Sequence, residues 1–284
     1  MGIKKNTSRK YFMITESSFK EINEQVNSAI NQAFDIAMKR TPSDYILLLA
    51  DAEYKAINLT YSPLLNPYVI DSQEDKWVDE TRVQYLVEFL KTFYSFPKGM
   101  EQVENSEIRQ QMELMIYTHV WESKPFLKRL YRLARLTASN SYDWKVIVPQ
   151  KRYNFISNKI RTLFENEKLQ LGEIIRQGYH SSLRNAFAHS EYSFDVKNGL
   201  IWLNNYGGAD WELKNISFDN WSTRFAYSVL IAYHLLDISN HRRLSLASDF
   251  QKNVFQISHP SSTGKVSLTN IFYEPEYNHF GFAI

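Results

Sequence analysis

The chain has 284 residues, of which 44% are hydrophobic, 15% aromatic and 23% charged, with nine Gly and eight Pro, and this composition excludes a disordered or fibrous protein. It has no cysteine, which excludes a disulfide framework and a thiolate zinc site and is compatible with a reducing cytosol. The formal net charge is only +2, which by itself indicates neither a nucleic-acid partner nor the lack of one.

Helical patterns dominate the first 150 residues. Residues 18–39 carry apolar side chains at helical spacing, and Ser18 with Glu21 forms a capping-box pattern ahead of them. Further helices are predicted in three segments: after Ser43, from Asp79 to Pro97, and from Ser106 to Thr137 with a kink or break at Pro125. We treat residues 1–150 as an N-terminal helical region whose role the sequence does not assign.

Positive charge gathers in one segment. Between Lys124 and Arg161 there are ten Lys or Arg and one acid, Asp143, which gives +9 in 38 residues. The first basic residues recur at spacings of four, four and three, which places them on one helix face. This stripe is either solvated surface or a track for RNA phosphates, and interleaved aromatic residues favour the second interpretation. The predicted RNA-binding residues are Lys124, Lys128, Arg132, Arg135, Lys151 and Arg152.

The second half of the chain alternates between helical and strand patterns. Helices are expected over residues 153–166, 169–188 and 219–244. Two alternating runs around Asn198-Gly199 predict a β-hairpin over residues 191–205. We expect residues 151–247 to form a helical core with this hairpin, and residues 248–284 to form a C-terminal tail of loops and short strands. One continuous domain is the alternative to these divisions.

No segment has the length and polarity of a membrane span. The most apolar window, residues 225–236, is twelve residues long and contains Ser228 and His234, well short of the roughly 20 residues needed to cross a bilayer. It is expected either to fill the core or to contact a partner subunit. Since no apolar run of signal-peptide length follows the basic N-terminus, we expect a cytoplasmic protein without a membrane partner.

The stretch "GYHSSLRNAFAHSEYSF", residues 178–194, places Arg184, Asn185 and His189 at the end of a predicted helix. On a straight helix five residues turn through about 500°, so Arg184 and His189 would point about 140° apart. The helix is expected to end near His189, which lets the imidazole turn toward the arginine or toward a second subunit. Asn185 lies four residues before His189 and can hold one ring nitrogen, and His180 lies one turn before Arg184.

An arginine and a histidine suffice for one kind of RNA cleavage. The guanidinium fork fits a phosphodiester and stabilises the charge that develops on its oxygens. The imidazole can take a proton from a ribose 2′-hydroxyl or give one to the 5′-oxygen. DNA lacks the 2′-hydroxyl, so this chemistry is specific for RNA. The sequence predicts no metal site and no cofactor.

The run Arg184-Asn185-Ala186-Phe187-Ala188-His189 resembles the Arg-polar-x3-His signature of the HEPN superfamily, and the following hairpin resembles an insertion in some bacterial HEPN families. The resemblance covers residues 169–245. It implies an all-α helical bundle with a small β-hairpin insertion and a metal-independent endoribonuclease, often a toxin or antiphage effector. It also implies a homodimer whose motifs face one another, with Arg184, His189 and Asn185 as catalytic residues and His180 and Tyr192 as accessory ones.

One position departs from the resemblance. In HEPN toxins paired with nucleotidyltransferase antitoxins a Tyr lies two residues after the His, whereas this chain has Glu191 there and Tyr192 one residue later. We therefore do not transfer that antitoxin mechanism, and any antitoxin or regulatory partner stays unidentified. The alternative hypothesis is a non-catalytic HEPN-type RNA- or protein-binding module, in which His189 caps a helix and Arg184 pairs with a carboxylate.

Overall fold

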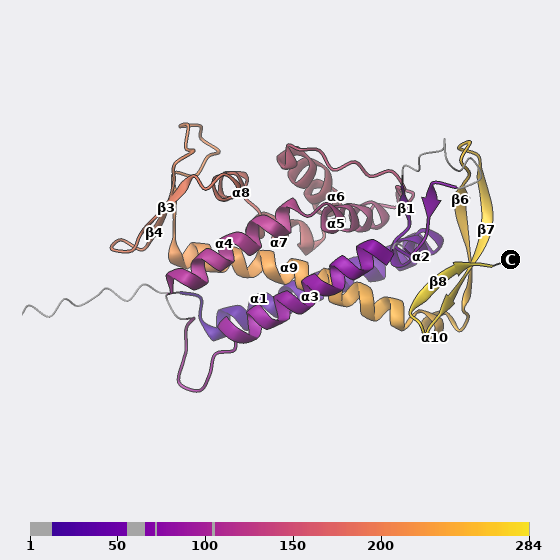
Figure 1. The fold of residues 1–284 in the computed structure, drawn as a ribbon, viewed down its shortest axis with the longest axis horizontal. Helices are drawn as coiled ribbons and strands as arrows, with labels where there is room; N and C mark the ends of the chain where they lie inside the picture. Colours follow the sequence, from indigo (N-terminus) through magenta and orange to yellow (C-terminus); the bar gives the residue numbers. More distant parts are fainter. Residues whose placement is uncertain (1–12, 56–65, 72, 104–105, 284) are drawn as a thin grey trace, which may run out of the picture.

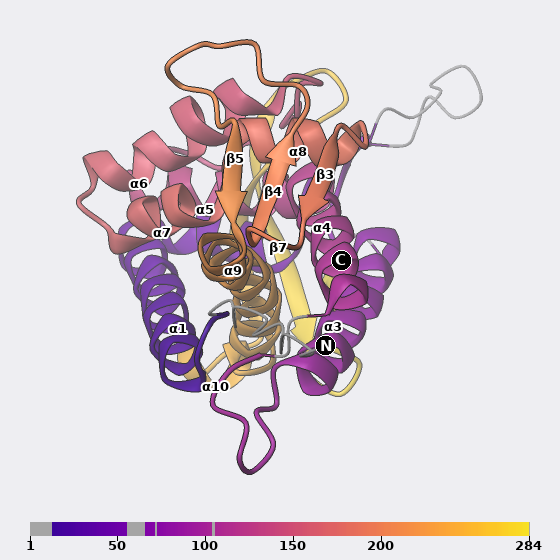
Figure 2. The same cartoon turned by 90° about the vertical axis from the view of Figure 1, so that its left-hand side faces the viewer.

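The computed structural model describes residues 13–55, 66–71, 73–103 and 106–283. This part of the chain is mostly helical and also contains small antiparallel sheets (Figure 1). The long helix α9 (Phe218–Leu244) runs through the middle of the molecule, as Figure 2 shows end-on. Helices α1 (Glu16–Arg40), α3 (Gln73–Phe93), α4 (Glu107–Glu122) and α7 (Gln170–Gly178) pack around it.

The position of α9 accounts for its apolar sequence. Its window 225–236 is buried by the surrounding helices, so the prediction that this segment fills the core is confirmed. His234 is held inside the protein by a 2.8 Å contact between its Nε2 and Asn23 Oδ1, and burial lowers the pKa of this imidazole to about 4. No helix among the described residues has both the length and the apolar character needed to span a membrane.

Capping side chains set the ends of several helices. Thr15 Oγ1 accepts a hydrogen bond from the Ser18 amide at the start of α1. The predicted helix from Ser106 to Thr137 is divided into α4 and α5 (Lys124–Thr137), because the side chain of Ser123 caps α5 by accepting from the Phe126 amide. Pro125 then lies in the first turn of α5, where its missing N–H costs no helical hydrogen bond.

The segment before the motif is more broken than the sequence predicted. Residues 153–166 form a π-helix, η1 (Asn154–Arg161), followed by α6 (Thr162–Asn166). The expected helix over 169–188 is two helices, α7 and α8 (Ser181–Ala188), separated by Tyr179 and His180 in extended conformation. The break is stabilised by the Tyr117 hydroxyl, which accepts from the His180 amide at 2.9 Å. As a result α8 is a short helix with its own direction.

A three-stranded antiparallel sheet follows α8. Strand β3 (Tyr192–Asp195) pairs with β4 (Leu200–Leu203), with Tyr192 opposite Leu203, and the turn between them uses Gly199 at a φ of 65°. A strand that the sequence did not predict, β5 (Asn215–Ser217), pairs with the other edge of β4. The β4–β5 loop, residues 204–214, lies next to α8 because the Leu213 amide donates to Ser182 Oγ at 3.3 Å.

The N- and C-terminal elements meet at the opposite end of α9 (Figure 1). Helix α2 (Pro42–Leu49) packs on a sheet made of β6 (Val254–Pro260), β7 (Val266–Glu274) and β8 (His279–Phe282), which follows α10 (Leu246–Phe250). Strands β1 (Glu53–Tyr54) and β2 (Tyr68–Val69) form a short antiparallel pair nearby.

The C-terminal sheet corrects two predictions. Residues 248–284 were expected to be loops and short strands, but β6 alternates buried and exposed side chains over its whole length, and β7 has nine residues. An all-α fold is therefore wrong for this end of the chain, and the fold is mostly helical with small antiparallel sheets. One hydrophobic core extends from Met13 to Phe280 and includes side chains from all three predicted segments.

Candidate functional site

A cavity of about 600 Å³ lies beside α8. Its walls come from the residues before η1, from the α7–α8 junction with α8 itself, and from the β4–β5 loop. The lining residues are Gln150, Lys151, Arg152, Tyr153, Tyr179, Ser181, Arg184, Asn185, His189 and Trp211. The structure thus brings the three predicted catalytic residues together with two of the predicted RNA-binding residues.

His189 is exposed and marks the end of α8. Its backbone N–H donates to the Asn185 carbonyl at 3.1 Å, and Ser190 follows in the left-handed region at a φ of 57°. The helix therefore ends where the sequence predicted. Within the part of the chain that the structure describes, no hydrogen bond or ion pair engages the imidazole ring. The ring is accessible to a ligand in the cavity.

Asn185 contacts the arginine of the motif, not the histidine. Its Oδ1 accepts a 2.7 Å hydrogen bond from Arg184 Nη1. The expected hydrogen bond from Asn185 to the ring of His189 is therefore replaced by one that orients the guanidinium. In this structure Asn185 is a positioning residue for Arg184.

Two arginines share a single carboxylate at the cavity. Arg184 Nη2 forms an ion pair with Glu122, the last residue of α4, and Arg152 Nη2 lies 3.3 Å from the other oxygen of the same carboxylate. The side chains of Arg152 and Arg184 are 8% and 15% exposed. Burial lowers the pKa of both guanidinium groups, as expected for cations removed from water.

Several buried N–H groups of these arginines have no acceptor. Among the described residues, three of these nitrogen atoms have no hydrogen-bond partner: Nε of Arg184, and Nε and Nη1 of Arg152. A buried donor without an acceptor costs roughly 1–3 kcal/mol, and more when it is charged. With Lys151 also lining the cavity, three cations are opposed by one carboxylate at this site. The cavity is therefore suited to an anion with several oxygen acceptors, such as a phosphate.

The two predicted accessory residues lie outside this lining. His180 caps α8 by accepting at Nδ1 from the Ser182 amide at 3.2 Å, and burial, with a smaller effect of Arg224, lowers the pKa of His180 to about 4. It is neutral at pH 7 and serves the helix. Tyr192 donates from its hydroxyl to Gln111 Oε1 at 2.7 Å and packs on the ring of Phe187. Both have structural roles here.

Two residues of the basic stripe on α5 pair with an acid from another part of the chain. Lys128 Nζ and Arg132 Nη2 bind the two carboxylate oxygens of Glu53 at 2.8 and 2.9 Å, and Arg132 is only 5% exposed. Arg135 donates to the Ser141 carbonyl, whereas Lys124 is exposed. The prediction of an exposed phosphate track is therefore wrong at Arg132. Equal spacing placed these cations on one face but did not reveal that an acid from β1 lies opposite.

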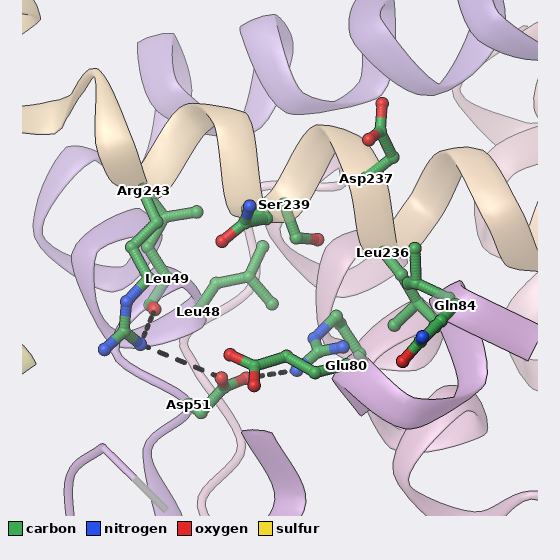
Figure 3. A pocket seen from close by; sticks show the side chains of 12 residues that line it. Leu48, Leu49, Asp51, Glu80, Gln84, Leu236, Asp237, Ser239 and Arg243 are labelled. Atoms are coloured by element: carbon green, nitrogen blue, oxygen red, sulfur yellow. Dashed lines mark hydrogen bonds and ion pairs between the residues drawn. The ribbon is translucent and has the colours of Figure 1, made fainter. Parts of the chain in front are cut away.

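A second cavity, of about 270 Å³, lies between α2, α3 and α9 and also contains charged groups. Figure 3 shows Arg243 of α9 reaching toward Asp51, with Glu80 and Gln84 on the other side. Arg243 Nη1 donates to the Leu49 carbonyl at 3.1 Å and lies 3.9 Å from Asp51 Oδ2 (Figure 3). Asp51 also forms an ion pair with Arg129 Nη2 at 2.6 Å, so both arginines of this cavity are engaged by a neighbouring acid, and we interpret the cluster as a structural network.

The sequence did not indicate two residues that shape the site. Glu122 comes from the end of α4, and Trp211 comes from the β4–β5 loop. Neither lies near the motif in the chain, and no local pattern connects them with it. In comparisons with known proteins, no family model matches this chain, and neither curated proteins nor solved structures give a match.

Proposed function

We propose that this chain is a HEPN-type, metal-independent endoribonuclease with Arg184 and His189 as its catalytic residues. The observation that carries the proposal is the cavity beside α8, where an accessible imidazole and two under-neutralised guanidinium groups line one space. The guanidinium groups are needed to bind a phosphodiester, and the imidazole is needed for proton transfer near neutral pH. The resemblance of residues 184–189 to the HEPN signature supports the same chemistry.

The proposed reaction is an internal transesterification. His189 takes the proton of a ribose 2′-hydroxyl, and the 2′-oxygen attacks the adjacent phosphorus. The bond from phosphorus to the 5′-oxygen breaks, leaving a 2′,3′-cyclic phosphate and a 5′-hydroxyl that takes up a proton. Arg184, oriented by Asn185 and Glu122, stabilises the charge on the non-bridging oxygens. Lys151 and Arg152 bind the same or a neighbouring phosphate.

His189→Ala tests this assignment. The variant is expected to lose RNA cleavage, at least about 100-fold, because the proton-transfer group is removed. The wild type should leave 2′,3′-cyclic phosphate ends, cut equally well in EDTA, and fail on RNA with a 2′-deoxy nucleotide at the cleavage site. His241→Ala is the matched control, since His241 is exposed on α9 and pairs with Asp237. Full activity in a folded His189→Ala protein contradicts the assignment.

A second candidate function is a non-catalytic module that binds RNA or a protein partner. The contacts of Arg184 favour it, because Glu122 and Asn185 already engage this guanidinium without a ligand. A binding module retains RNA binding with a steep salt dependence and releases no fragments. Measuring cleavage and binding on the same purified protein separates the two functions.

We also propose that the chain acts as a homodimer and as a toxin or antiphage effector, as its resemblance to HEPN proteins implies. The exposure of His189 at the tip of α8 supports a dimer in which a second copy approaches the cavity. The expected results are a dimeric mass in solution and growth arrest when the wild type is expressed in bacteria. Expression of His189→Ala should relieve the arrest.

A further inference from the structure

Two exposed aromatic side chains line the cavity beside α8. Tyr153 and Trp211 both line it, and they are 49% and 60% exposed, whereas Arg152 is 7% exposed. Their ring centroids are 6.5 Å apart with an interplanar angle of 32°. We call this pair the aromatic platform. It combines exposed aromatic surface with a buried cationic wall in one cavity.

The chain holds the platform in place through local contacts. Tyr153 directly follows Arg152 at the start of η1, so the cation and the ring come from adjacent residues. Trp211 lies in a loop organised by Glu212, whose Oε2 accepts from the amides of Gly207 at 2.7 Å and Ala209 at 3.3 Å. The Leu213 amide then ties this loop to Ser182 of α8. These contacts place the backbone of both residues beside the arginines of the cavity.

We infer that this cavity binds an unpaired nucleotide of RNA, with its base stacked on Tyr153 and Trp211 and its phosphate bound by Arg152. Aromatic side chains beside cations that follow the backbone are typical of single-strand binding, since every base offers a π-face. A base within a duplex is covered on both faces by its neighbours and cannot stack on the platform. The buried, unpartnered Nε and Nη1 of Arg152 supply donors for phosphate oxygens.

This inference deepens the proposed function and rests on it for the identity of the ligand. It adds a substrate class, single-stranded RNA, and assigns specificity to three residues outside the Arg-His motif. Lys151 is exposed beside Arg152 and contributes only charge. Arg184 and His189 contact the scissile linkage next to the stacked nucleotide.

The test measures binding separately from cleavage. A short single-stranded RNA carrying 2′-O-methyl groups, which block attack by the 2′-oxygen, is labelled and titrated in fluorescence anisotropy. The same RNA in a duplex and a free nucleoside monophosphate are the comparison ligands. We expect the single strand to bind most tightly, because only it offers both an unpaired base and several phosphates.

Variants of the platform identify the contacts. Trp211→Ala and Tyr153→Ala are expected to weaken single-strand binding about 5- to 150-fold each, the range for loss of one stacked base. Trp211→Phe should restore most of the affinity. Arg152→Gln should reduce the steepness of the plot of log affinity against log salt concentration by about one, because one phosphate contact is lost. Tyr206→Ala is the matched control, since Tyr206 is 41% exposed in the same loop but does not line the cavity.

The outcomes distinguish this inference from the proposed function. Unchanged single-strand binding in both platform variants overturns the inference. A wild type that binds the duplex or the free nucleotide as tightly as the single strand also overturns it. Both results do so even if the wild type cleaves RNA. Weakened binding in these variants, together with full cleavage by His189→Ala, supports the inference and contradicts the proposed catalytic role. A wild type that binds no RNA contradicts both. Because both rings are exposed, the variants are expected to fold, which circular dichroism checks.

Discussion

Replacing Glu122 by Gln tests the electrostatic description of the cavity. Glu122 is the acid that forms ion pairs with both Arg152 and Arg184, and its side chain is 31% exposed. A bound phosphate would use the same two guanidinium groups, so the carboxylate repels it and competes for their N–H donors. Glu122→Gln keeps the shape of the side chain and removes its charge. We therefore expect RNA and inorganic phosphate to bind more tightly.

Coulomb's law gives the order of magnitude of this effect. At a separation of about 6 Å and an effective dielectric constant between about 20 and 80, two unit charges interact by about 0.7–2.8 kcal/mol. Removing that repulsion strengthens binding by about 3- to 100-fold, with the lower end expected because the carboxylate is partly exposed. The same change should lower the thermal midpoint, since two buried cations lose their counter-ion.

The assay is a titration of the uncleavable single strand at two salt concentrations. Glu88→Gln is the matched control, because it removes one negative charge from an exposed ion pair with Lys91 on α3. Tighter binding by Glu122→Gln alone supports the described charge arrangement. Weaker binding would refute it, because the carboxylate would then be needed to hold the arginines in a binding conformation.

Two further predictions concern stability. Glu113 is fully buried, accepts hydrogen bonds from Tyr94 Oη at 2.6 Å and Trp221 Nε1 at 2.9 Å, and forms an ion pair with Arg109. Because Glu113→Gln leaves the buried charge of Arg109 without its partner, it should lower the free energy of unfolding, measured by urea denaturation, by about 3–5 kcal/mol. Burial lowers the pKa of His234 from 6.5 to about 4, so between these pH values the unfolded chain binds a proton at this residue and the folded chain does not. The free energy of unfolding therefore has its full value above pH 6.5 and decreases as the pH falls toward 4. His234→Gln should flatten the pH dependence in this window, by up to about 3 kcal/mol, and an unchanged slope contradicts the assignment.

Helices with strong local signals were predictable from the sequence. The periodic apolar positions of residues 18–39 correspond to α1, and the apolar window 225–236 lies in α9. The division of residues 169–188 was not predictable, because His180 caps α8 with an imidazole nitrogen and the break depends on a hydroxyl 63 residues away, that of Tyr117. Local propensity carries no information on such a partner.

The extent of the C-terminal sheet and the ion pairs of the basic stripe could not be predicted for the same physical reason. The extent of the sheet depends on pairing between its strands and on packing of β6 against α2, which residues far away in the sequence provide. Likewise, the sequence places Lys128 and Arg132 on one face of a helix, but Glu53, which forms ion pairs with both, lies 75 and 79 residues away. Only the tertiary fold decides whether a cation faces solvent or a buried acid.

The candidate site divides in the same way between local and distant contributions. In the proposed function, the six residues from Arg184 to His189 supply a phosphate-binding group and a proton-transfer group, and the sequence predicted that both would lie at the end of one helix. Whether these groups have room for a ligand depends on residues from three other segments, namely Glu122, Arg152 and Trp211. Glu122 satisfies only part of the hydrogen-bonding capacity of the two arginines, which leaves donors for a phosphate. Loss of the charge on Glu122 should therefore change affinity for every phosphate ligand alike, whereas loss of Trp211 should change affinity only for ligands with an unpaired base.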